Sequence, residues 1–244
     1  MYPTVEIASQ AVSTYALIHV VGTLIAGMLL FHLLFRAGIE GDVLRRLIVV
    51  LVLSGVAGAV GLGYLLGLWE GKTGWVGLSS AGLLMGSFAG TSVFVRLHSL
   101  NFGTILDHGA IATSLWLGIG RIGCAMAGCC YGKPTDGALG RMLPDISGSV
   151  CPRYPTQVLA AAVDLLLFSI LLYLSGREDG RRSGNIAMLF IGAFAFKRML
   201  LDFLRADLQP VLGPVSPHQL LALVVFLLVV WAFIRQRYPG MREG

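Results

Sequence analysis

Seven long apolar stretches alternate with short polar or charged segments along the chain. They cover about residues 14–35, 47–69, 75–95, 104–131, 153–174, 185–204 and 220–234. A helix needs about 20 predominantly apolar residues to cross the hydrocarbon core of a bilayer, and each stretch is close to that length. The pattern predicts an all-α, polytopic integral membrane protein with about seven transmembrane helices. We expect a single transmembrane domain over residues 1–244.

The composition agrees with this class and excludes an ordinary soluble domain. Hydrophobic residues make up 56% of the chain and charged residues 13%, and the mean hydropathy is +0.79. In a soluble chain the net charge of +5 would favour nucleic acid as a partner. Here the basic residues fall mainly in short loops between apolar stretches, so we expect a membrane as the partner and no nucleic acid.

The distribution of basic residues also predicts the orientation. With the amino terminus outside and the carboxyl terminus in the cytoplasm, basic residues are more frequent in the cytoplasmic segments, as the positive-inside rule requires. The cytoplasmic ones are at positions 36, 45, 46, 96, 177, 181, 182, 235, 237 and 242, and the outer ones at 72, 133, 141, 153 and 205. The longest outer loop, at about 133–153, is long enough for a lid or binding loop. These features favour a multi-pass protein of the bacterial inner (plasma) membrane.

The stretch 118–135 combines an apolar run with an arginine and three thiols. A fixed charge is costly in hydrocarbon, so Arg121 is by default a functional residue that faces the protein interior or a wet cavity. Glycines in this stretch let backbone or ligand come close to the helix; they are Gly118, Gly120, Gly123, Gly128 and Gly132. The alternative is a close-packed helix in which Arg121 only pairs with an acid on a neighbouring helix.

A second group of cations lies near the outer end of the sixth stretch. Arg198 and Arg205 fall there, and Arg121 reaches a similar depth from the fourth stretch. Arginine suits phosphate because its planar fork donates two parallel hydrogen bonds and stays charged when desolvated. The pattern predicts an anion site, and a phospholipid headgroup is the anion within reach of the outer leaflet. Internal salt bridges to Asp164 and Asp202 are the competing explanation.

Tyr15 and His19 lie four residues apart near the outer end of the first stretch. This spacing places them on one helical face, so both side chains are expected to face the same cavity. The alternative is that Tyr15 is an anchor at the membrane interface and that His19 is hydrogen-bonded to neighbouring backbone.

Three of the four cysteines cluster at positions 124, 129 and 130. A nearby cation such as Arg121 favours a low-pKa thiolate, which acts as a nucleophile, a redox centre or a soft-metal ligand. Ordinary packing as small buried hydrophobes is the alternative. No histidine or second cysteine pair completes a tetrahedral set at a usual spacing, so we expect no metal and no cofactor.

The fourth cysteine, Cys151, lies on the same outer side as Cys129 and Cys130 in the predicted topology, where disulfides persist. Adjacent cysteines rarely bond each other, because the bridge strains the peptide. We therefore predict a disulfide from Cys151 to Cys129 or Cys130, which would close a loop of about twenty residues.

Several of these segments resemble the bacterial prolipoprotein diacylglyceryl transferases, and the resemblance covers most of the chain. Residues 15–22 are similar to the family's first-span motif, with Tyr15 on its functional tyrosine and His19 in place of a second aromatic. Residues 118–132 look like the family signature, with Arg121 on the signature arginine.

The remaining matches lie in the second half of the chain. Residues 154–157 resemble the family's entry to the fifth span, and residues 216–221 resemble the start of its last helix. Gly128 and Gly132 fall on the signature glycines, and the family's Arg…Glu…Arg pattern in the sixth span is matched by Arg198, Asp202 and Arg205.

The chain also departs from the family pattern. The family's histidine-glycine-glycine motif in the third span reads Ser-Ala-Gly at 80–82, so its histidine is missing. The signature asparagines become Cys124 and Ala127, the signature glutamate becomes Cys129, and a second-span arginine becomes Gly61.

The resemblance implies transfer of a diacylglyceryl group from phosphatidylglycerol to the cysteine thiol of a lipoprotein signal peptide, with release of glycerol phosphate. It implies that Arg121 and Arg198 hold the phosphate and offset the charge on the leaving group. His19 is the expected base, since His108 lies near the inner end. Lipid contacts are expected from Tyr15, Gly128, Gly132, Asp202 and Arg205. The rival hypothesis is a membrane thiol-dependent group transferase or redox protein that uses Cys124, Cys129 and Cys130 on a lipid or other small substrate.

Overall fold

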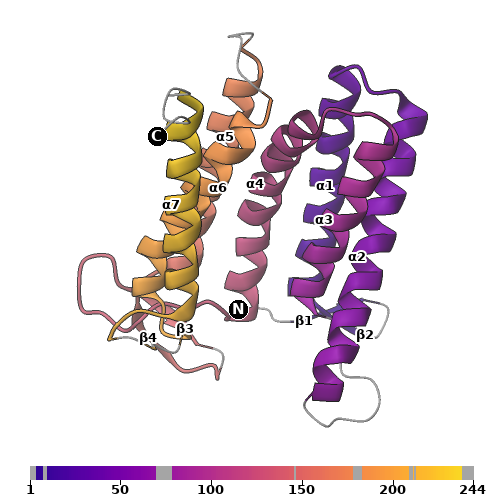
Figure 1. The fold of residues 1–244 in the computed structure, drawn as a ribbon. Coiled ribbons are helices and arrows are strands. Elements are labelled where there is room, and N and C mark those ends of the chain that lie inside the picture. Colours follow the sequence, from indigo (N-terminus) through magenta and orange to yellow (C-terminus); the bar gives the residue numbers. More distant parts are fainter. Residues whose placement is uncertain are drawn as a thin grey trace. The chain divides into compact units, whose positions relative to one another are not determined.

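The computed structural model describes residues 4–7, 10–69, 79–145, 147–177, 183–208, 211 and 213–237. Its helices are α1 Thr14–Arg36, α2 Gly41–Trp69, α3 Ser80–Leu97, α4 Phe102–Ala127, α5 Thr156–Ser175, α6 Asn185–Leu201 and α7 Pro217–Arg237, with a short 3-10 helix, η1, at Asp202–Leu204 (Figure 1). Seven helices were expected, and the predominantly helical class is confirmed. The expected outer turn at 70–74, most of the basic loop at 177–182, and Arg242 lie outside the described residues.

In the part of the chain that the structure describes, five helical segments are long and apolar enough to cross a membrane. They are α1, residues Gly41–Leu65 of α2, α4, α5 and residues Pro217–Gln236 of α7. The other two helices, α3 with 18 residues and α6 with 17 residues, are not among them. Long apolar helices whose faces are largely exposed are typical of a multi-pass membrane protein, because lipid covers such faces.

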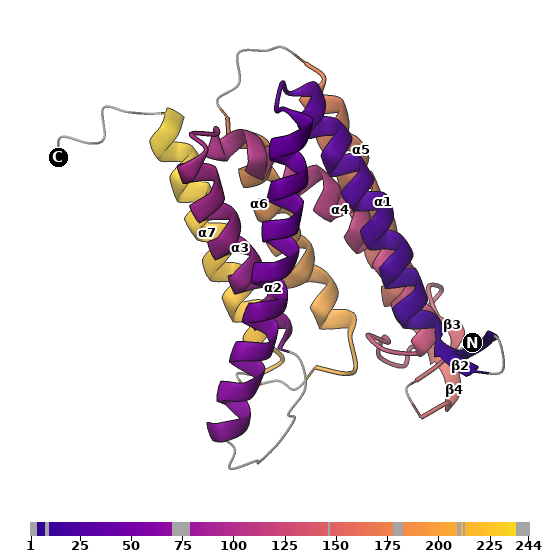
Figure 2. The same cartoon turned by 90° about the vertical axis from the view of Figure 1, so that its right-hand side faces the viewer.

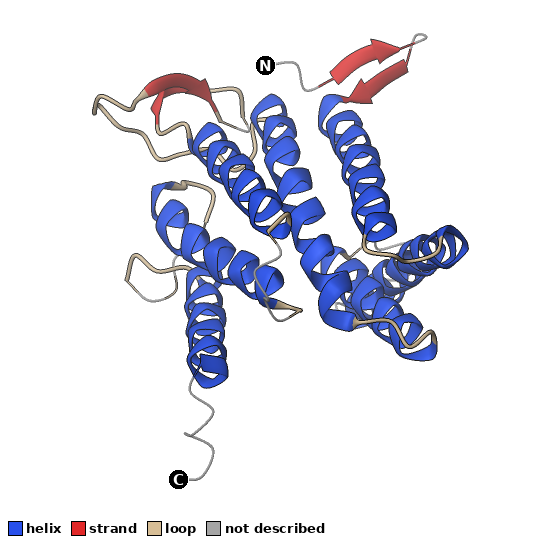
Figure 3. Ribbon diagram, turned by 90° about the horizontal axis from the view of Figure 1, so that it is seen from above, coloured by secondary structure: helices blue, strands red, loops and turns tan. Residues whose placement is uncertain are grey.

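Strands in the described residues are confined to two hairpins, drawn in red in Figure 3. The first pairs β1, Thr4–Ile7, with β2, Gln10–Ser13, and the second pairs β3, Arg141–Pro144, with β4, Val150–Arg153. The apolar pattern predicted no strands. Each strand of the two hairpins has four residues, and the hairpins lie outside the long helices. The prediction was based on long apolar stretches, so it did not cover these short segments.

The chain separates into two compact units, and the boundaries fall within α1 and α4. One unit contains Phe31–Ile105 and the other contains Met1–Leu30 with Leu106–Gly244. In the first unit α2 and α3 lie side by side (Figure 2). A methyl group on Gly58 would lie 2.2 Å from the carbonyl oxygen of Gly82, and one on Gly86 would lie 2.2 Å from that of Ser54. The backbones of these helices touch because small residues line their contact.

In the second unit, α4 is held against α1 and α6. The indole nitrogen of Trp116 on α4 donates to the hydroxyl of Thr23 on α1 over 3.0 Å. The carboxylate of Asp107 accepts from the backbone nitrogens of Gly184 at 2.7 Å and Ala187 at 2.8 Å. An acidic side chain at these positions satisfies free amides at the start of α6 and interacts favourably with the helix dipole.

Several helix limits differ from the expected ones, and two of them have a local explanation. α2 begins at Gly41, not near residue 47, because Asp42 in its first turn stabilises an earlier start and pairs with Arg45. α4 ends at Ala127 and not near residue 131, because Gly128 has a φ of 74°, which reverses the backbone.

Candidate active site

The carboxyl end of α4 turns back on itself in a glycine-dependent cap. The nitrogen of Cys129 donates to the carbonyl oxygen of Cys124 over 3.2 Å, and Gly128 between them is left-handed. This is the Schellman pattern, in which the residue after the helix takes a conformation that glycine adopts without steric cost. Cys130 continues the reversal with a φ of 58°, which is unusual for a residue with a side chain. The turn brings three cysteines to the end of one helix.

The segment that follows is held between the end of α6 and the start of α5. Backbone hydrogen bonds join Lys133 to Leu204 at 2.7 Å and to Tyr154 at 3.2 Å. Gly132 pairs with Arg205 in an isolated bridge, and a methyl group on it would lie 2.2 Å from the carbonyl oxygen of Tyr154. Glycine is therefore required at position 132 for close backbone approach.

Two side chains at the start of α5 fix the backbone of the adjacent cysteines. The hydroxyl of Thr156 donates to the carbonyl oxygen of Cys130 over 2.7 Å, and the amide of Gln157 donates to that of Cys129 over 3.0 Å. Thr156 and Gln157 are 3% and 4% exposed, so these bonds are shielded from competing water. The resemblance of residues 154–157 to a family motif thus has a local physical reason.

A small pocket lies beside this turn, between the carboxyl ends of α4 and α6 and the first turns of α5. It is lined by Arg121, Cys130, Thr156, Ala160, Lys197, Arg198, Leu201, Asp202 and Arg205. Four of the lining side chains are cationic and one is acidic, so the lining carries an excess of positive charge.

Most of the cations already have acidic partners. Asp202 accepts from Arg198 at 3.1 Å and lies 3.4 Å from a guanidinium nitrogen of Arg205. Arg205 also binds Asp207 through two nitrogens, at 2.7 and 2.9 Å. Burial opposes the charged form of Arg205, but the hydrogen bond to Asp207 and the neighbouring negative groups raise its pKa above the ordinary value. The competing salt-bridge explanation is confirmed for Arg198, because Asp202 is its partner.

Lys197 is a pocket residue that sequence reasoning missed. Its ammonium group lies 2.5 Å from a carboxylate oxygen of Asp164 on α5, and both side chains are buried. The other oxygen of Asp164 is buried without a hydrogen-bond partner in the described part of the chain. The adjacent cations at 197 and 198 in an apolar run were the available signal, together with an acid in the middle of the fifth stretch.

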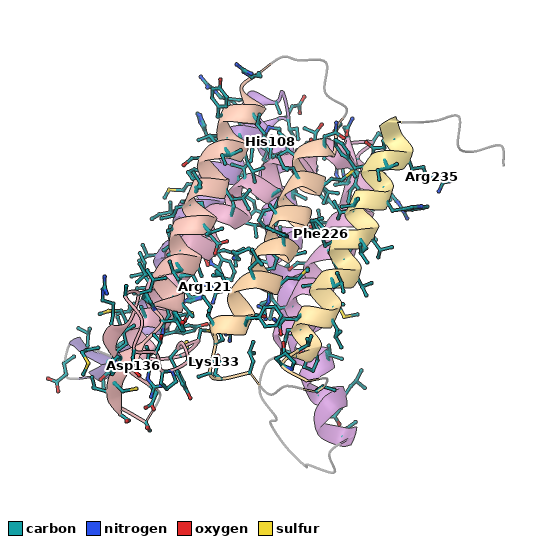
Figure 4. The ribbon with its side chains drawn as sticks, turned by 90° about the vertical axis from the view of Figure 1, so that its left-hand side faces the viewer. His108, Arg121, Lys133, Asp136, Phe226 and Arg235 are labelled. Atoms are coloured by element: carbon teal, nitrogen blue, oxygen red, sulfur yellow. The ribbon has the colours of Figure 1, made fainter. Side chains whose placement is uncertain are left out.

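Arg121 differs from the other cations of the pocket. Within the described residues no ion pair or hydrogen bond to its guanidinium is found, and Asp164 pairs with Lys197 instead. Figure 4 shows Arg121 on the part of α4 toward Lys133 and Asp136, with His108 at the other end of the helix. Among the described residues, the four cations of the pocket have three carboxylate partners, those of Asp164, Asp202 and Asp207, and none of these is paired with Arg121.

The three clustered thiols lie next to these cations. The sulfurs of Cys124, Cys129 and Cys130 are all within 4.8 Å of one another, and a guanidinium nitrogen of Arg205 is 3.5 Å from that of Cys130. Beyond the end of α4, a hydrogen bond from the Cys124 thiol lowers the pKa of Cys130 to about 6 against the effect of burial, and Arg205 and Arg121 act in the same direction. The expected proximity of thiol and cation is therefore present.

All four cysteines are free, so the predicted disulfide is wrong. Cys151 belongs to β4, where it pairs with Leu143 of β3. Cys129 and Cys130 are instead held in the cap of α4 by Gln157 and Thr156. The prediction of a disulfide failed because Cys151 and the pair Cys129 and Cys130 belong to segments that are held by different partners. The spacing of these cysteines along the chain does not show this.

Tyr15 and His19 do share a face of α1. Their ring centroids are 4.0 Å apart, and the imidazole Nδ1 of His19 lies 3.0 Å from the carbonyl oxygen of Tyr15. A methyl group on Gly120 would lie 3.1 Å from Nε2, so a glycine of α4 makes room for the imidazole. His19 is not among the residues that line the pocket.

The structure thus brings together five of the predicted site residues around one pocket: Arg121, Arg198, Asp202, Arg205 and Cys130. Cys124 and Cys129 lie beside it through their contact with Cys130. Gly128 and Gly132 shape the backbone, and His19 packs against the same helix as Arg121. The remaining predicted roles in lipid contact and proton transfer stay predictions.

The chain is similar to one family of enzymes over nearly its whole length. The pattern of the prolipoprotein diacylglyceryl transferases matches residues 3–235. A phosphatidylglycerol–prolipoprotein diacylglyceryl transferase of Geobacter sulfurreducens is 30% identical over 233 residues, which are 88% of this chain and 86% of that protein.

Two clostridial proteins of the same name are also similar. That of Clostridium perfringens, the second of its kind there, is 24% identical over 98% of this chain and 96% of its own length. That of Clostridium tetani is 28% identical, and the match covers 64% of this chain and 63% of that protein.

Proposed function

This chain belongs to the prolipoprotein diacylglyceryl transferase family, and we propose that it transfers a diacylglyceryl group from phosphatidylglycerol to a cysteine thiol of a lipoprotein precursor. Glycerol phosphate is the leaving group. The chain is a multi-pass membrane protein, and we propose that it resides in the bacterial inner membrane. We propose the lipoprotein signal peptide as the segment that holds the acceptor cysteine.

The main support for the proposal is the guanidinium of Arg121, which has no acidic partner within the described residues and lies in a pocket with three further cations. An uncompensated charge in a partly buried site is costly, so it is retained where a ligand of opposite charge binds. A phosphodiester offers two oxygens in the geometry that a guanidinium fork matches. Arg121 is the proposed primary phosphate ligand.

Arg198 and Arg205 complete the anion site in this proposal. Asp202 lies between them and fixes the direction of both guanidinium groups. As the carbon–oxygen bond to phosphate breaks, negative charge grows on the leaving phosphate, and preorganised cations stabilise it without reorganisation. Asp202 is a positioning residue, since it acts through the arginines.

The acceptor thiol must lose its proton before it attacks carbon. His19 is the proposed base, because a neutral imidazole has one nitrogen that can accept a proton. If Nδ1 donates its hydrogen to the carbonyl oxygen of Tyr15, the lone pair remains on Nε2, the nitrogen that faces Gly120. The Tyr15 hydroxyl is a proposed contact to the lipid headgroup.

The rival hypothesis was a thiol-dependent group transferase or redox protein. The relatives described above are named as diacylglyceryl transferases of phosphatidylglycerol and prolipoprotein, which gives that rival no support. The thiol cluster is then a feature within a diacylglyceryl transferase and not the basis of another activity.

Reconstitution tests the proposal. Purified protein in vesicles of phosphatidylglycerol is incubated with a lipoprotein signal peptide that holds one cysteine, and the peptide mass is measured. Addition of a diacylglyceryl group to that peptide, but not to its Cys→Ser form, is the expected result. Absence of modified peptide with phosphatidylglycerol, while the folded protein still binds the lipid, would overturn it.

A further inference from the structure

The sulfurs of Cys124, Cys129 and Cys130 converge on one point at the end of α4. Their mutual separations are within 4.8 Å, although the residues span a helix end, a glycine and a loop. The hydrogen bond from Cys129 to the carbonyl oxygen of Cys124 curls the chain back, and it is this reversal that brings the later thiols to the earlier one. Packing as independent hydrophobes does not require such convergence.

The backbone around these thiols is fixed from outside the cluster. Thr156 holds the carbonyl oxygen of Cys130, Gln157 holds that of Cys129, and both donors are buried. The left-handed φ of Cys130 persists because these bonds determine it. A set of ligands held by a second layer of hydrogen bonds is typical of metal centres.

We propose that Cys124, Cys129 and Cys130 bind one thiophilic divalent cation, zinc, as a three-thiolate site with an open fourth position. Zinc–sulfur bonds of about 2.3 Å place tetrahedral sulfurs about 3.8 Å apart. The sulfurs here lie within 4.8 Å of one another, so a contraction of at most about 1 Å completes the set. Structural zinc sites have four protein ligands, whereas sites that act on a substrate keep one position open. Three ligands therefore indicate the second kind.

The charges around the cluster favour this cation. Three thiolates and a divalent ion leave one negative charge, which matches the nearby guanidinium of Arg205, 3.5 Å from the sulfur of Cys130. Arg121, without an acidic partner in the described residues, adds a second positive charge in the same pocket. Thiolates without a metal would instead carry a larger uncompensated charge in a partly buried site.

The consequence for the reaction rests on the proposed function. Cys130 lines the pocket that holds the phosphate-binding arginines, so a ligand in the fourth position lies in that pocket. The acceptor thiol binds zinc there, loses its proton to water or His19, and is held as a thiolate. Its sulfur then forms a bond to the glyceryl carbon as the carbon–oxygen bond to phosphate breaks, and glycerol phosphate leaves with the electron pair. The site thus supplies thiol activation where the histidine that the resemblance led us to expect is replaced in this chain.

Metal titration tests the site without reference to activity. Full-length protein in detergent, reduced and freed of metal without oxygen, is titrated with Co²⁺, whose thiolate complexes have a strong charge-transfer absorption, and then with Zn²⁺. One ion per chain is expected, with Zn²⁺ displacing Co²⁺. The Cys124→Ser, Cys129→Ser and Cys130→Ser variants should each lose at least about tenfold in affinity, since each removes one of three ligands. Cys151→Ser, whose thiol lies in β4, should bind as the wild type does.

Three results would overturn the proposal: no stoichiometric binding by the reduced wild type, equal binding by Cys130→Ser, or an equal loss in Cys151→Ser. Circular dichroism of each variant shows whether a loss of binding reflects a loss of the fold. Cys129→Ala provides a second test, because a free cysteine packs as a small hydrophobic group and alanine replaces it without adding a polar atom. Removal of zinc should lower peptide modification about 100-fold and Zn²⁺ should restore it. Undiminished transfer without zinc overturns the activation step and leaves the transferase function intact, whereas zinc binding without any transfer contradicts the proposed function and leaves the metal site.

Discussion

The hydroxyl of Thr156 donates a hydrogen bond of 2.7 Å to the carbonyl oxygen of Cys130. This bond joins the first residue of α5 to the left-handed turn that follows α4, and both residues line the pocket. The start of one helix therefore sets the position of a thiol and of the adjacent cations at the end of another.

Replacing Thr156 by Val should disturb the pocket while the fold is kept. The substitution retains the shape but leaves the carbonyl oxygen of Cys130 buried without its donor, at a cost of about 1–3 kcal/mol. We expect the kcat/KM of peptide modification to fall about tenfold, since about 1.4 kcal/mol corresponds to that factor. Thr156→Ser keeps the hydroxyl and should remain near the wild type. Equal rates for the Val and wild-type proteins would show that the bond does not position the site.

Replacing Asp202 by Asn should weaken lipid binding more than it slows the chemical step. The carboxylate lies 3.1 Å from Arg198 and 3.4 Å from Arg205, and an amide cannot hold two guanidinium groups in register. We expect KM for phosphatidylglycerol to rise about tenfold with a smaller change in kcat. The matched control is Asp136→Asn, an exposed carboxylate of the outer loop. An unchanged KM in Asp202→Asn, with the protein folded, would contradict its positioning role.

The helical fold was predictable because length and hydropathy alone determine where a helix crosses a bilayer. The end of α4 was not, since it depends on the left-handed backbone of Gly128 and Cys130, a conformation that no apolar period encodes. For the same reason the spacing of Cys124 and Cys130 could not show that their sulfurs meet. Convergence through a turn is a three-dimensional property.

The candidate site was predicted only in part, because the sequence shows which residues are charged but not which of them meet. Arg121, Arg198 and Arg205 were found because intramembrane charge is rare and therefore conspicuous. Lys197 was overlooked beside Arg198, although its pairing with Asp164 is what leaves Arg121 without an acidic partner in the described residues. Which acid takes which cation depends on helix rotation, and rotation is set by packing that the sequence pattern does not specify.

The contact between α2 and α3 predicts different effects for two nearby glycines. A methyl group on Gly58 would meet the backbone oxygen of Gly82 at 2.2 Å, and backbone atoms cannot move aside cheaply. Gly58→Ala should therefore lower the free energy of unfolding by about 1–3 kcal/mol. Around Gly61 nothing lies within 4 Å, so Gly61→Ala should raise it by up to about 1 kcal/mol. Thermal unfolding in one detergent compares them, and equal midpoints would contradict the close contact.

The hairpin of β3 and β4 should loosen in acid. The hydroxyl of Ser147 donates to Asp145, as do the nitrogens of Ser147 and Ser149, and with Arg153 at 2.9 Å these donors hold the pKa of Asp145 below its ordinary value. Because the folded-state pKa is the lower one, the stabilisation is complete above the unfolded value of about 3.9 and is lost as the pH falls through the folded value.

Proteolysis of the β3–β4 hairpin by an acid-active protease between about pH 5 and pH 2 checks this expectation. Cleavage within 141–153 should increase only at the acid end of the range. Asp145→Asn, which carries no charge to lose, should be cleaved to the same extent throughout, apart from the intrinsic pH dependence of the protease on an unfolded substrate. A wild-type profile parallel to that of the Asn variant would contradict the role of the carboxylate.

Replacing Arg121 by Lys should abolish most of the transferase activity while the net charge of the pocket stays the same. Lysine is a point charge and cannot donate two parallel hydrogen bonds to a phosphate, so the loss measures the guanidinium geometry and not the charge. Loss of one preorganised donor to a developing anion costs about 100-fold or more in kcat, and we expect that for Arg121→Lys and for Arg198→Lys. Arg141→Lys is the matched control, because within the described residues its guanidinium donates only to the carbonyl oxygens of Ala138 and Gly140, away from the pocket. Wild-type rates of peptide modification in both pocket variants would show that neither arginine binds the phosphate through its fork, and the anion site would then have to be assigned to Lys197 and Arg205.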